Sequence, residues 1–414
     1  MKATDTLLIG VDGGATEVKA HATSCDDLAG PTSFELRPEA ASRVYPRLAD
    51  FAPVPVAAQL AERDAGDSAA DAVEVEQGRL WVQAAAEAIR DVASQCAVQH
   101  ILVGVGMPGL KTADGRGIDV INNGPRIPDY LDTLEKELAA AGLELLSPVA
   151  ALGSDADYCG LGEQHAAQGL FRDVENAYYV GCGTGVADAI KLRGRLVPFD
   201  AVRAWIQKSW QMASALGPTF ERLVSASSLN RVYADLRPAA KQAGGTARAT
   251  VKRDERTARQ ADAFVSSYPE VAAAAGDPVA VAWLQAAAAV LAELIFERLW
   301  TVSNGRADAA HRGEAYAQLE QEHAYRGTLL DRVIIGQRVG QMYAEPAYRG
   351  VFGERLDACL ASLIQACGEA ALARKWLSGD GRLQGGLLVP SKLRAAPALG
   401  AAVAAVQALG GTAG

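Results

Sequence analysis

The chain has 414 residues, of which 50% are hydrophobic and 21% are charged, and its formal net charge is −9. This length exceeds what one hydrophobic core usually organises, so we expect two lobes. The acidic balance argues against a nucleic-acid-binding surface. No apolar run reaches the roughly 18 residues that span a bilayer, and the first residues do not resemble a signal peptide. We therefore expect a cytoplasmic protein with no membrane partner.

The first lobe is expected over residues 1–150. Residues 7–14 (LLIGVDGG) predict a buried strand that ends in a glycine turn, and residues 17–23 alternate like a second strand paired with it. Loop and short helices are expected from Pro38 to Glu76, because the periodicity there is weak. Further predicted elements are helices over 78–96 and 129–141, and strands over 100–106, 117–121 and 143–149. This order is typical of a β/α lobe.

The second lobe is expected over residues 151–414. A helix over 155–168 and strands over 176–181 and 186–192 are predicted, and helix then dominates to about residue 300. A basic stretch around 237–259 is interpreted as a solvated loop or helix face, with a phosphate-binding arm as the alternative. The last predicted elements are strands over 331–336 and 385–391 and a helix over about 396–410, which is a candidate to pack back on the first lobe.

The six cysteines are scattered, without CxxC pairs or histidines at ligand spacing. This pattern predicts free thiols and no zinc site. The residues are Cys25, Cys96, Cys159, Cys182, Cys359 and Cys367.

Two segments about 170 residues apart share one pattern. Residues 7–22 and 177–192 each read as an apolar strand, a glycine-rich turn with a threonine, and an alternating strand. The repeat is too distant for a solenoid. A duplicated fold that places the two turns face to face across a cleft explains it; chance similarity of two hairpins is the alternative.

The first turn predicts a phosphate and magnesium site. Gly13 and Gly14 leave room for phosphate oxygens at the backbone amides, and Thr16 follows them. Asp12 would hold Mg²⁺ through water, because Mg²⁺ usually keeps several waters and few carboxylates. A plain Asp-Gly hairpin turn is the alternative.

The second turn contains Gly181, Gly183, Thr184 and Gly185. Three glycines in five residues exceed what a hairpin needs, so we expect a large group to lie against the backbone. The β- and γ-phosphates of a nucleotide fit this spacing, with Thr184 donating a hydrogen bond.

Asp155 is the candidate general base, which would take the proton from an attacking hydroxyl. Asp157 is its rival, and a simple helix cap is the alternative for either residue. Residues 104–109 match GxGxxG, but a turn and a strand follow instead of a helix, so a dinucleotide site is not supported. The chain has no GxxxxGK[ST] motif, and His165 is interpreted as a surface or packing residue.

Together these segments resemble the ROK family of sugar kinases, within the actin/hexokinase/Hsp70 superfamily. The matched pieces, spread over most of the chain, are DGGATEVK, GVGMPGLKTADGRG, GPRIPDY, SDADYCGLGE, GCGTG, ERLVSASSL, VIIGQRVG and APALGAAVAA. The resemblance implies an α/β, two-lobed actin-like ATPase fold (ribonuclease H-like and duplicated), with a helical insertion in the second lobe. It also implies the cofactors ATP and Mg²⁺, and by analogy a homodimer.

The resemblance assigns roles to residues of this chain. Asp155 matches the family's catalytic aspartate. The expected cofactor-binding residues are Asp12, Gly13, Gly14, Thr16, Lys19, Gly181, Gly183, Thr184, Gly185, Gly336, Gln337 and Gly340, of which the last three would lie against the adenosine. The expected substrate-binding residues are Pro108, Gly109, Asn122, Asn123, Arg126, Ser154, Trp205, Gln207 and Lys208.

The acceptor half of the site departs from the family. Residues 195–212 contain neither the Glu-x-Gly-His signature nor the cysteine-rich zinc motif, and Ser154 and Arg126 stand where asparagines are usual. We therefore expect phosphorylation of a hydroxyl on a modified hexose, an amino sugar or a cyclitol. Alternatives are a BadF/N-acetylglucosamine-kinase-like ATPase or kinase, and a non-catalytic sugar sensor. A sensor of the repressor type would need a DNA-binding domain ahead of residue 7, for which we expect no room.

Overall fold

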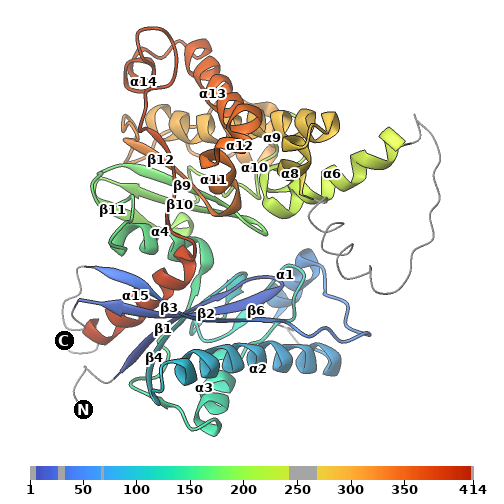
Figure 1. Ribbon diagram of the computed structural model, residues 1–414, viewed down its shortest axis with the longest axis vertical. Helices are drawn as coiled ribbons and strands as arrows, with labels where there is room; N and C mark the ends of the chain where they lie inside the picture. The colour runs from blue at the N-terminus through green and yellow to red at the C-terminus, as the bar shows by residue number, and fades with distance from the viewer. Residues whose placement is uncertain (1–5, 27–32, 67–69, 242–267, 412–414) are drawn as a thin grey trace. The chain divides into compact units, whose positions relative to one another are not determined.

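The computed structural model describes residues 6–26, 33–66, 70–241 and 268–411, with only the backbone at 238–241 and 411 (Figure 1). The chain divides into two compact units. Unit 1 comprises Met1–Asp173 and Leu393–Gly414, and unit 2 comprises Val174–Lys392. Unit 1 thus extends to Asp173, beyond residue 150, where the boundary between the lobes was expected. Helix α4 (Asp155–His165) belongs to unit 1, because it packs against the final helix α15 (Ala396–Gly411).

Unit 1 is built on a sheet with the strand order β3-β2-β1-β4-β7, and β8 also pairs with β4. Strand β1 is antiparallel to β2 and parallel to β4, and β4 is parallel to β7 and β8. A separate two-stranded sheet joins β5 and β6. The strands are β1 (Leu7–Gly13), β2 (Glu17–Cys25), β3 (Phe34–Val44), β4 (His100–Met107), β5 (Leu110–Lys111), β6 (Ile118–Val120), β7 (Glu144–Leu145) and β8 (Leu152–Ser154).

Strand β3 lies where loop and short helices were expected. Pro38 breaks the sequence pattern of a strand, because proline cannot donate to a ladder of hydrogen bonds. Here β2 is the strand that pairs with β3, which lies at the edge of the sheet, and the register shifts between His21 and Thr23, opposite this part of β3. Edge strands with such irregularities tolerate proline, so the expectation failed at this segment.

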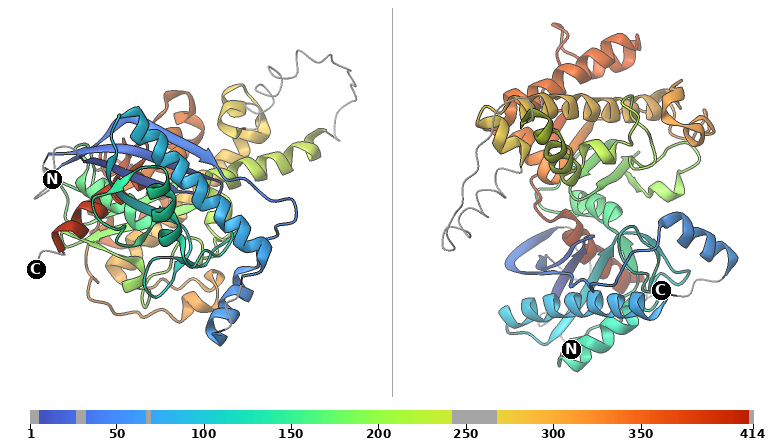
Figure 2. Two further views of the ribbon diagram at one scale, coloured as in Figure 1. Left: turned by 90° about the horizontal axis from the view of Figure 1, so that it is seen from below. Right: turned by 90° about the vertical axis from the view of Figure 1, so that its right-hand side faces the viewer.

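The two faces of the unit 1 sheet are covered by different helices (Figures 1 and 2). Alternate residues of β1 separate the two cores: Ile9 packs with α2 and α3, whereas Leu8 packs with α15. This alternation follows from the two-residue period of a strand. The helices of unit 1 are α1 (Val56–Ala65), α2 (Ala72–Gln95), α3 (Tyr130–Ala140), α4 and α15.

Helix α15 contacts the sheet through its backbone. A Cβ added to Gly10 would lie 1.8 Å from the Ala398 carbonyl oxygen, and one added to Gly104 would lie 1.8 Å from that of Ala401. Only glycine allows this approach, because any side chain would overlap the helix. Glycines on β1 and β4 thus seat α15 directly on the strands that end at the candidate site.

Unit 2 repeats the sheet arrangement of unit 1. Its strand order is β11-β10-β9-β12-β13, in which β9 is antiparallel to β10 and parallel to β12. The strands are β9 (Ala177–Cys182), β10 (Val186–Leu192), β11 (Arg195–Val197), β12 (Arg332–Gly336) and β13 (Leu388–Pro390). The hairpin β9–β10 thus corresponds to β1–β2, and the duplicated fold predicted from the echo in the sequence is confirmed.

Helices make up most of the rest of unit 2. They are α5 (Glu221–Val224), α6 (Ala226–Lys241), α8 (Pro269–Ala274), α9 (Pro278–Asn304), α10 (Glu314–Ala317), α11 (Gln337–Ala344), α12 (Pro346–Tyr348), α13 (Glu354–Ala366) and α14 (Ala370–Trp376), with short η2 (Phe199–Ala201), η4 (Ala310–Arg312) and η5 (Arg349–Gly353) segments. Most of the basic stretch at 237–259 lies outside the described residues.

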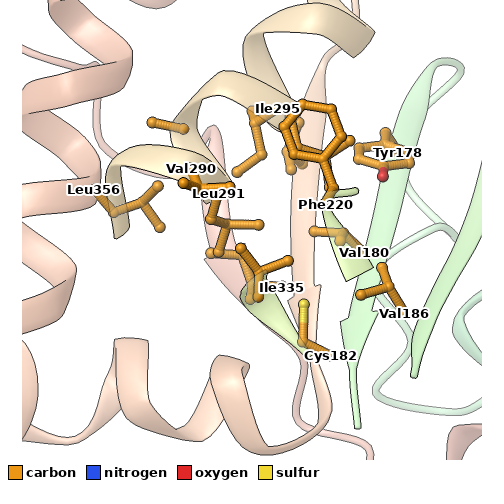
Figure 3. Packing of buried hydrophobic residues seen from close by; sticks show 14 of the residues in the cluster. Tyr178, Val180, Cys182, Val186, Phe220, Val290, Leu291, Ile295, Ile335 and Leu356 are labelled. Carbon is orange, nitrogen blue, oxygen red and sulfur yellow. The ribbon is translucent and has the colours of Figure 1, made fainter. Parts of the chain in front are cut away.

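Helix α9 is the centre of the unit 2 core. Its residues Leu291 and Ile295 pack with Val180 of β9 and Leu356 of α13 (Figure 3). Within the described residues, α9 is the one helix long and apolar enough to cross a membrane, with a mean hydropathy of 2.0, which corrects the expectation of no such run. Because 56% of that apolar window is buried inside the protein, the composition of α9 is that of a core helix.

Candidate functional site

Two carboxylates lie at the ends of β1 and β8 in unit 1, two strands that both pair with β4. Asp12 of β1 pairs with Gly106 of β4, and Gly106 pairs with Gly153 of β8. These strands are parallel, so their carboxyl ends meet at one edge of the sheet. Asp155 follows Gly153 by two residues and opens α4. The fold therefore brings Asp12 and Asp155, predicted from separate motifs, to the same edge.

The two carboxylates interact electrostatically. Burial, and after it the negative charge of Asp155, raises the pKa of Asp12 from 3.8 to about 6. Lys19, directly opposite Asp12 on β2, opposes this shift, but its ammonium group is also paired with Glu17 at 2.7 Å. The edge therefore carries negative charge that the described side chains do not fully balance.

The first turn is tight. The amide of Gly14 donates to the carbonyl of Glu17 at 2.9 Å, and Thr16 is exposed beyond it. A Cβ on Gly13 would lie 1.9 Å from the sulfur of Met107 on β4. Packing within the sheet thus requires glycine at position 13. The interpretation of this turn as a phosphate site did not predict that second reason for the glycine.

Asp155 occupies the first turn of α4, next to Ser154 at the N-cap. Its Oδ1 atom accepts a hydrogen bond from the Ala156 amide at 3.0 Å, and its side chain is partly exposed. Tyr158, one turn into the helix, is buried, and burial together with the charge of Asp157 raises its pKa to about 12. The helix therefore presents an accessible Asp155 above a neutral, buried tyrosine.

Pro108 and Gly109 form the turn that leaves β4. Gly109 has a φ of +90°, in the region that favours glycine. The ammonium group of Lys111 donates to the carbonyls of Met107 at 2.6 Å and of Gly109 at 2.9 Å. Lys111, which the sequence did not single out, therefore fixes the shape of this turn.

Asn122 and Asn123 are exposed on a loop that is held in place by Gln59. The amide side chain of Gln59 clamps the residue before them: its Oε1 accepts from the Ile121 amide at 2.8 Å, and its Nε2 donates to the Ile121 carbonyl at 2.9 Å. Asn123 has a φ of +61°, which asparagine tolerates better than most residues. Both side chains are therefore available to a ligand.

Arg126 does not line the surface as expected. Its side chain is 6% exposed and forms a bidentate pair with Glu74, with contacts of 3.0 Å to Oε1 and 2.6 Å to Oε2. It also pairs with Glu62. Every strong donor of the guanidinium is thus engaged within unit 1. In this structure Arg126 anchors the loop that carries Asn122 and Asn123, and its predicted contact with a substrate stays a prediction.

In unit 2, the second turn is clamped by the segment that follows it in sequence. The Gly183 carbonyl accepts from the Ala226 amide at 2.8 Å, and the Thr184 carbonyl accepts from the Ser227 hydroxyl. Glu221 accepts from the Val186 amide at 3.0 Å. These contacts hold the turn in one conformation and leave the Thr184 side chain exposed.

The residues predicted to lie against adenosine follow β12. Gly336 pairs with Gly181 across the sheet, and both lie against the buried Tyr179. Gly340 follows one turn later in α11, where a Cβ would lie 2.2 Å from the Ile335 carbonyl oxygen. Gln337 lies between them and is the first residue of α11. The fold thus brings this group to the same edge of the unit 2 sheet as the second turn.

The proposed acceptor segment is largely core. Trp205 is 5% exposed and stacks on His323 with ring centroids 3.9 Å apart. Gln207 is also buried, and Lys208 pairs with Asp200 at 3.1 Å. Trp205 and Gln207 thus present little surface to solvent, and their predicted contact with a substrate stays a prediction. Trp210, by contrast, is 50% exposed.

A buried ionic network explains why this segment packs inward. Asp188 of β10 accepts from the Ser209 hydroxyl at 2.6 Å and the Ser209 amide at 2.8 Å. Arg298 of α9, fully buried, lies 3.3 Å from Asp188 and 2.8 Å from Glu297. A buried charge must be paired to be tolerated, so Ser209, Asp188 and Arg298 together tie residues 205–210 to the core.

The residues of unit 1 fit Mg²⁺ in the manner predicted for Asp12. A carboxylate whose pKa is raised by a second carboxylate gains stability when a cation approaches. Among the described residues, no group of three or more His, Cys, Asp or Glu side chains could hold a metal. A site with few protein carboxylates and several waters is nevertheless the usual form for Mg²⁺.

A cavity of about 780 Å³ opens at the opposite ends of β1 and β4 from Asp12. Basic side chains reach it, but each has an acidic neighbour: Arg37 lies 2.9 Å from Glu39, and His100 lies 3.1 Å from Glu144. None of the predicted site residues lines this cavity. Its balanced charges give no reason to place a phosphate there.

Sequence reasoning missed the residues that support the site. Gln59 and Glu74 are polar residues on otherwise amphipathic helices, and both are buried. Glu221, Ser225 and Ser227 lie in a segment that was matched as a motif but given no role. The available signal was a polar residue on the apolar face of a helix, which needs a buried partner.

No family model matches this chain, and no curated protein matches it. Solved structures do. A protein from Cytophaga hutchinsonii proposed to be a sugar kinase aligns with 96% of this chain and 99% of its own, with a TM-score of 0.52 and 14% identity. A ROK family glucokinase from Streptomyces griseus, solved in complex with glucose and AMPPNP, aligns with 97% of this chain and 99% of its own, with a TM-score of 0.52 and 17% identity. The chain therefore has the two-lobed α/β fold of ROK-family sugar kinases.

Proposed function

We propose that the chain is a divergent ROK-family kinase that transfers a phosphoryl group from ATP to a hydroxyl group of a sugar or sugar-like molecule. The observation that carries this proposal is the pair Asp12 and Asp155, which lie at the carboxyl ends of β1 and β8, the two strands that flank the end of β4. The fold supports it, because the Streptomyces griseus structure with this fold binds glucose and an ATP analogue.

Asp155 is the proposed general base. Its carboxylate is partly exposed at the start of α4, and an attacking hydroxyl would transfer its proton to this group as the bond to phosphorus forms. Asp12 would hold the hydration shell of Mg²⁺, whose charge, when bound, offsets that of the phosphates. Gly183, Thr184 and Gly185 in unit 2 would bind the phosphates.

The acceptor would contact the exposed loop residues Asn122 and Asn123. Asparagine side chains both donate and accept hydrogen bonds, as sugar hydroxyls do. Residues 195–212 lack the family's Glu-x-Gly-His signature, Trp205 and Gln207 are buried in the core of unit 2, and the Lys208 ammonium group is paired with Asp200. The groups expected to select an ordinary hexose are therefore missing from this segment. We propose a modified hexose, an amino sugar or a cyclitol as the acceptor.

A coupled ADP-release screen tests this function. Wild-type protein with ATP and Mg²⁺ is presented with hexoses, amino sugars, N-acetylated sugars and cyclitols, and Asp155→Asn is run in parallel. ADP release that depends on one acceptor class and is lost in the variant supports the proposal. Release that is equal with and without every acceptor would instead indicate an ATPase, and would contradict the proposed transfer.

A further inference from the structure

Gln337 has a backbone conformation that disfavours its own residue type. It stands where β12 meets α11, and its φ is +58°, in the left-handed region where glycine is preferred. Among the described residues, the other non-glycine residues with a positive φ are Ala97, Asn123 and Arg193. A glycine at this position would adopt the conformation more easily, so the side chain of Gln337 needs an explanation.

The side chain of Gln337 lies against the second turn. A Cβ added to Gly183 would lie 1.8 Å from Gln337 Oε1 but 3.6 Å from its Nε2. The amide therefore faces the turn with its oxygen, and its nitrogen points away from Gly183. Both residues belong to unit 2, at the carboxyl ends of the parallel strands β9 and β12.

Several donors at this edge are not used by the protein. Within the described ranges, the side-chain amide of Gln337 and the backbone amides of Thr184 and Gly185 have no hydrogen-bond partner, whereas the Gly183 amide donates to Gly185 at 3.0 Å. Neighbouring N–H groups that lack acceptors suit an anionic oxygen. Phosphate oxygens are such acceptors.

We propose that Gln337 is a specificity-determining residue that donates a hydrogen bond from Nε2 to the β- or γ-phosphate of the bound nucleotide. This inference rests on the proposed function and deepens it. The left-handed backbone directs the amide to the second turn, and this placement explains why strain is retained at a functional site. The Gln337 amide would add one hydrogen bond to those from the backbone amides, and, being uncharged, it would not neutralise the phosphate charge.

The variant Gln337→Gly separates the contact from the strain. Glycine removes the donor and relaxes the backbone, so the midpoint of thermal unfolding should stay unchanged or rise by up to about 3 °C. Affinity for ATP and ADP, measured by isothermal titration calorimetry with Mg²⁺, should fall about tenfold or more, as expected for a hydrogen bond to a charged group. Affinity for AMP, which lacks both outer phosphates, should change less than about twofold.

Ala97→Gly is the matched control. Ala97 has a φ of +53° and lies between α2 and β4 of unit 1, whereas the second turn belongs to unit 2. It should show the same relaxation of the backbone without any change in nucleotide affinity.

The contact itself is tested through Gly183. A methyl group in Gly183→Ala would overlap the amide of Gln337, so this variant should weaken ATP binding. The double variant Gly183→Ala/Gln337→Gly should bind ATP no more weakly than Gln337→Gly alone, because the overlapping group is gone.

The inference would be overturned if Gln337→Gly bound ATP as tightly as the wild type, or if its affinity for AMP fell as much as its affinity for ATP. A clear fall in the unfolding midpoint of Gln337→Gly would also overturn it, because that result would indicate a packing role alone. These readouts do not depend on an acceptor. A wild-type protein that binds nucleotide but phosphorylates nothing would therefore remove the proposed function and leave the Gln337 contact standing. A wild-type protein that binds no nucleotide would remove both.

Discussion

Asp12 and Asp155 lie on one edge of the unit 1 sheet, and the charge of Asp155 helps to raise the pKa of Asp12 to about 6. Ionised Asp12 is therefore less favourable in the folded chain than in the unfolded one. Between pH 3.8 and about 6 the folded state holds more protons at this group, so its contribution to stability falls as the pH rises.

Asp12→Asn should make the protein more stable at neutral pH. The shift from 3.8 to about 6 corresponds to a penalty of at most about 3 kcal/mol at pH 7, which the amide does not incur. Urea unfolding at pH 4 and pH 7 measures it: the gain should be large at pH 7 and small at pH 4. The exposed Asp64→Asn controls for loss of one charge, and an equal gain there would contradict the prediction.

Binding of Mg²⁺ near Asp12 should also be measurable as a change in the thermal stability of the wild-type protein. Mg²⁺ in millimolar amounts should raise the unfolding midpoint of the wild type at pH 7 and have no effect on Asp12→Asn. The effect should fade below pH 6, as Asp12 becomes protonated. Stabilisation that is equal in both proteins would mean that Mg²⁺ binds elsewhere.

Asp155→Asn should reduce phosphoryl transfer at least 100-fold, because general-base catalysis typically contributes that much. ATP affinity should stay within about threefold of the wild type, since Asp155 is assigned to the proton. Asp157→Asn is the matched control on the same helix, and steady-state kinetics distinguish the two. A larger loss in Asp157→Asn would reverse the assignment.

Arg126→Ala should destabilise unit 1 by about 3–5 kcal/mol, because it leaves Glu74 buried without its partner. Chemical denaturation measures the change. Arg79→Ala removes a similar but exposed pair, with Glu76 at 2.7 Å, and should cost less than about 1 kcal/mol. Equal effects would contradict the buried pairing of Arg126 with Glu74 and favour the substrate contact predicted from the sequence.

Trp205→Ala should lower stability by about 3–5 kcal/mol, the range for a buried aromatic residue. Trp210→Ala, in the same segment but exposed, should change it by less than about 1 kcal/mol. Thermal unfolding compares them directly. If Trp205→Ala kept wild-type stability and lost acceptor affinity, the packing role would be wrong.

The sequence predicted the fold well because its signals were repeated. Two strand–glycine turn–strand patterns marked β1–β2 and β9–β10, and hydrophobic periodicity marked α2 and α15. Strand β3 was missed, because Pro38 hides an edge strand whose pairing depends on β2. The extension of unit 1 beyond residue 150 was not predicted, because only tertiary packing assigns α4 to unit 1.

The candidate site was predictable where a motif names a backbone position, as at Asp12, Asp155 and Gly183. The role of a site residue was not predictable where it depends on whether the side chain is buried. Arg126 and Trp205 have side chains suited to a ligand, and the sequence does not show that Glu74 and His323 already occupy them. Gln337 was matched by position alone, and its left-handed backbone could be seen only in the structure.

Helix α15 completes unit 1 from the far end of the chain. Residues 174–392 form unit 2 between the two parts of unit 1, so on the ribosome unit 2 can fold before unit 1 receives its last helix. Until then, the glycine-bearing strands β1 and β4 have no cover on one face, and the edge that carries Asp12 has no support from α15. Because α15 also packs against α4, which carries Asp155, the two elements of the carboxylate pair gain this common support only after unit 2 has been synthesised.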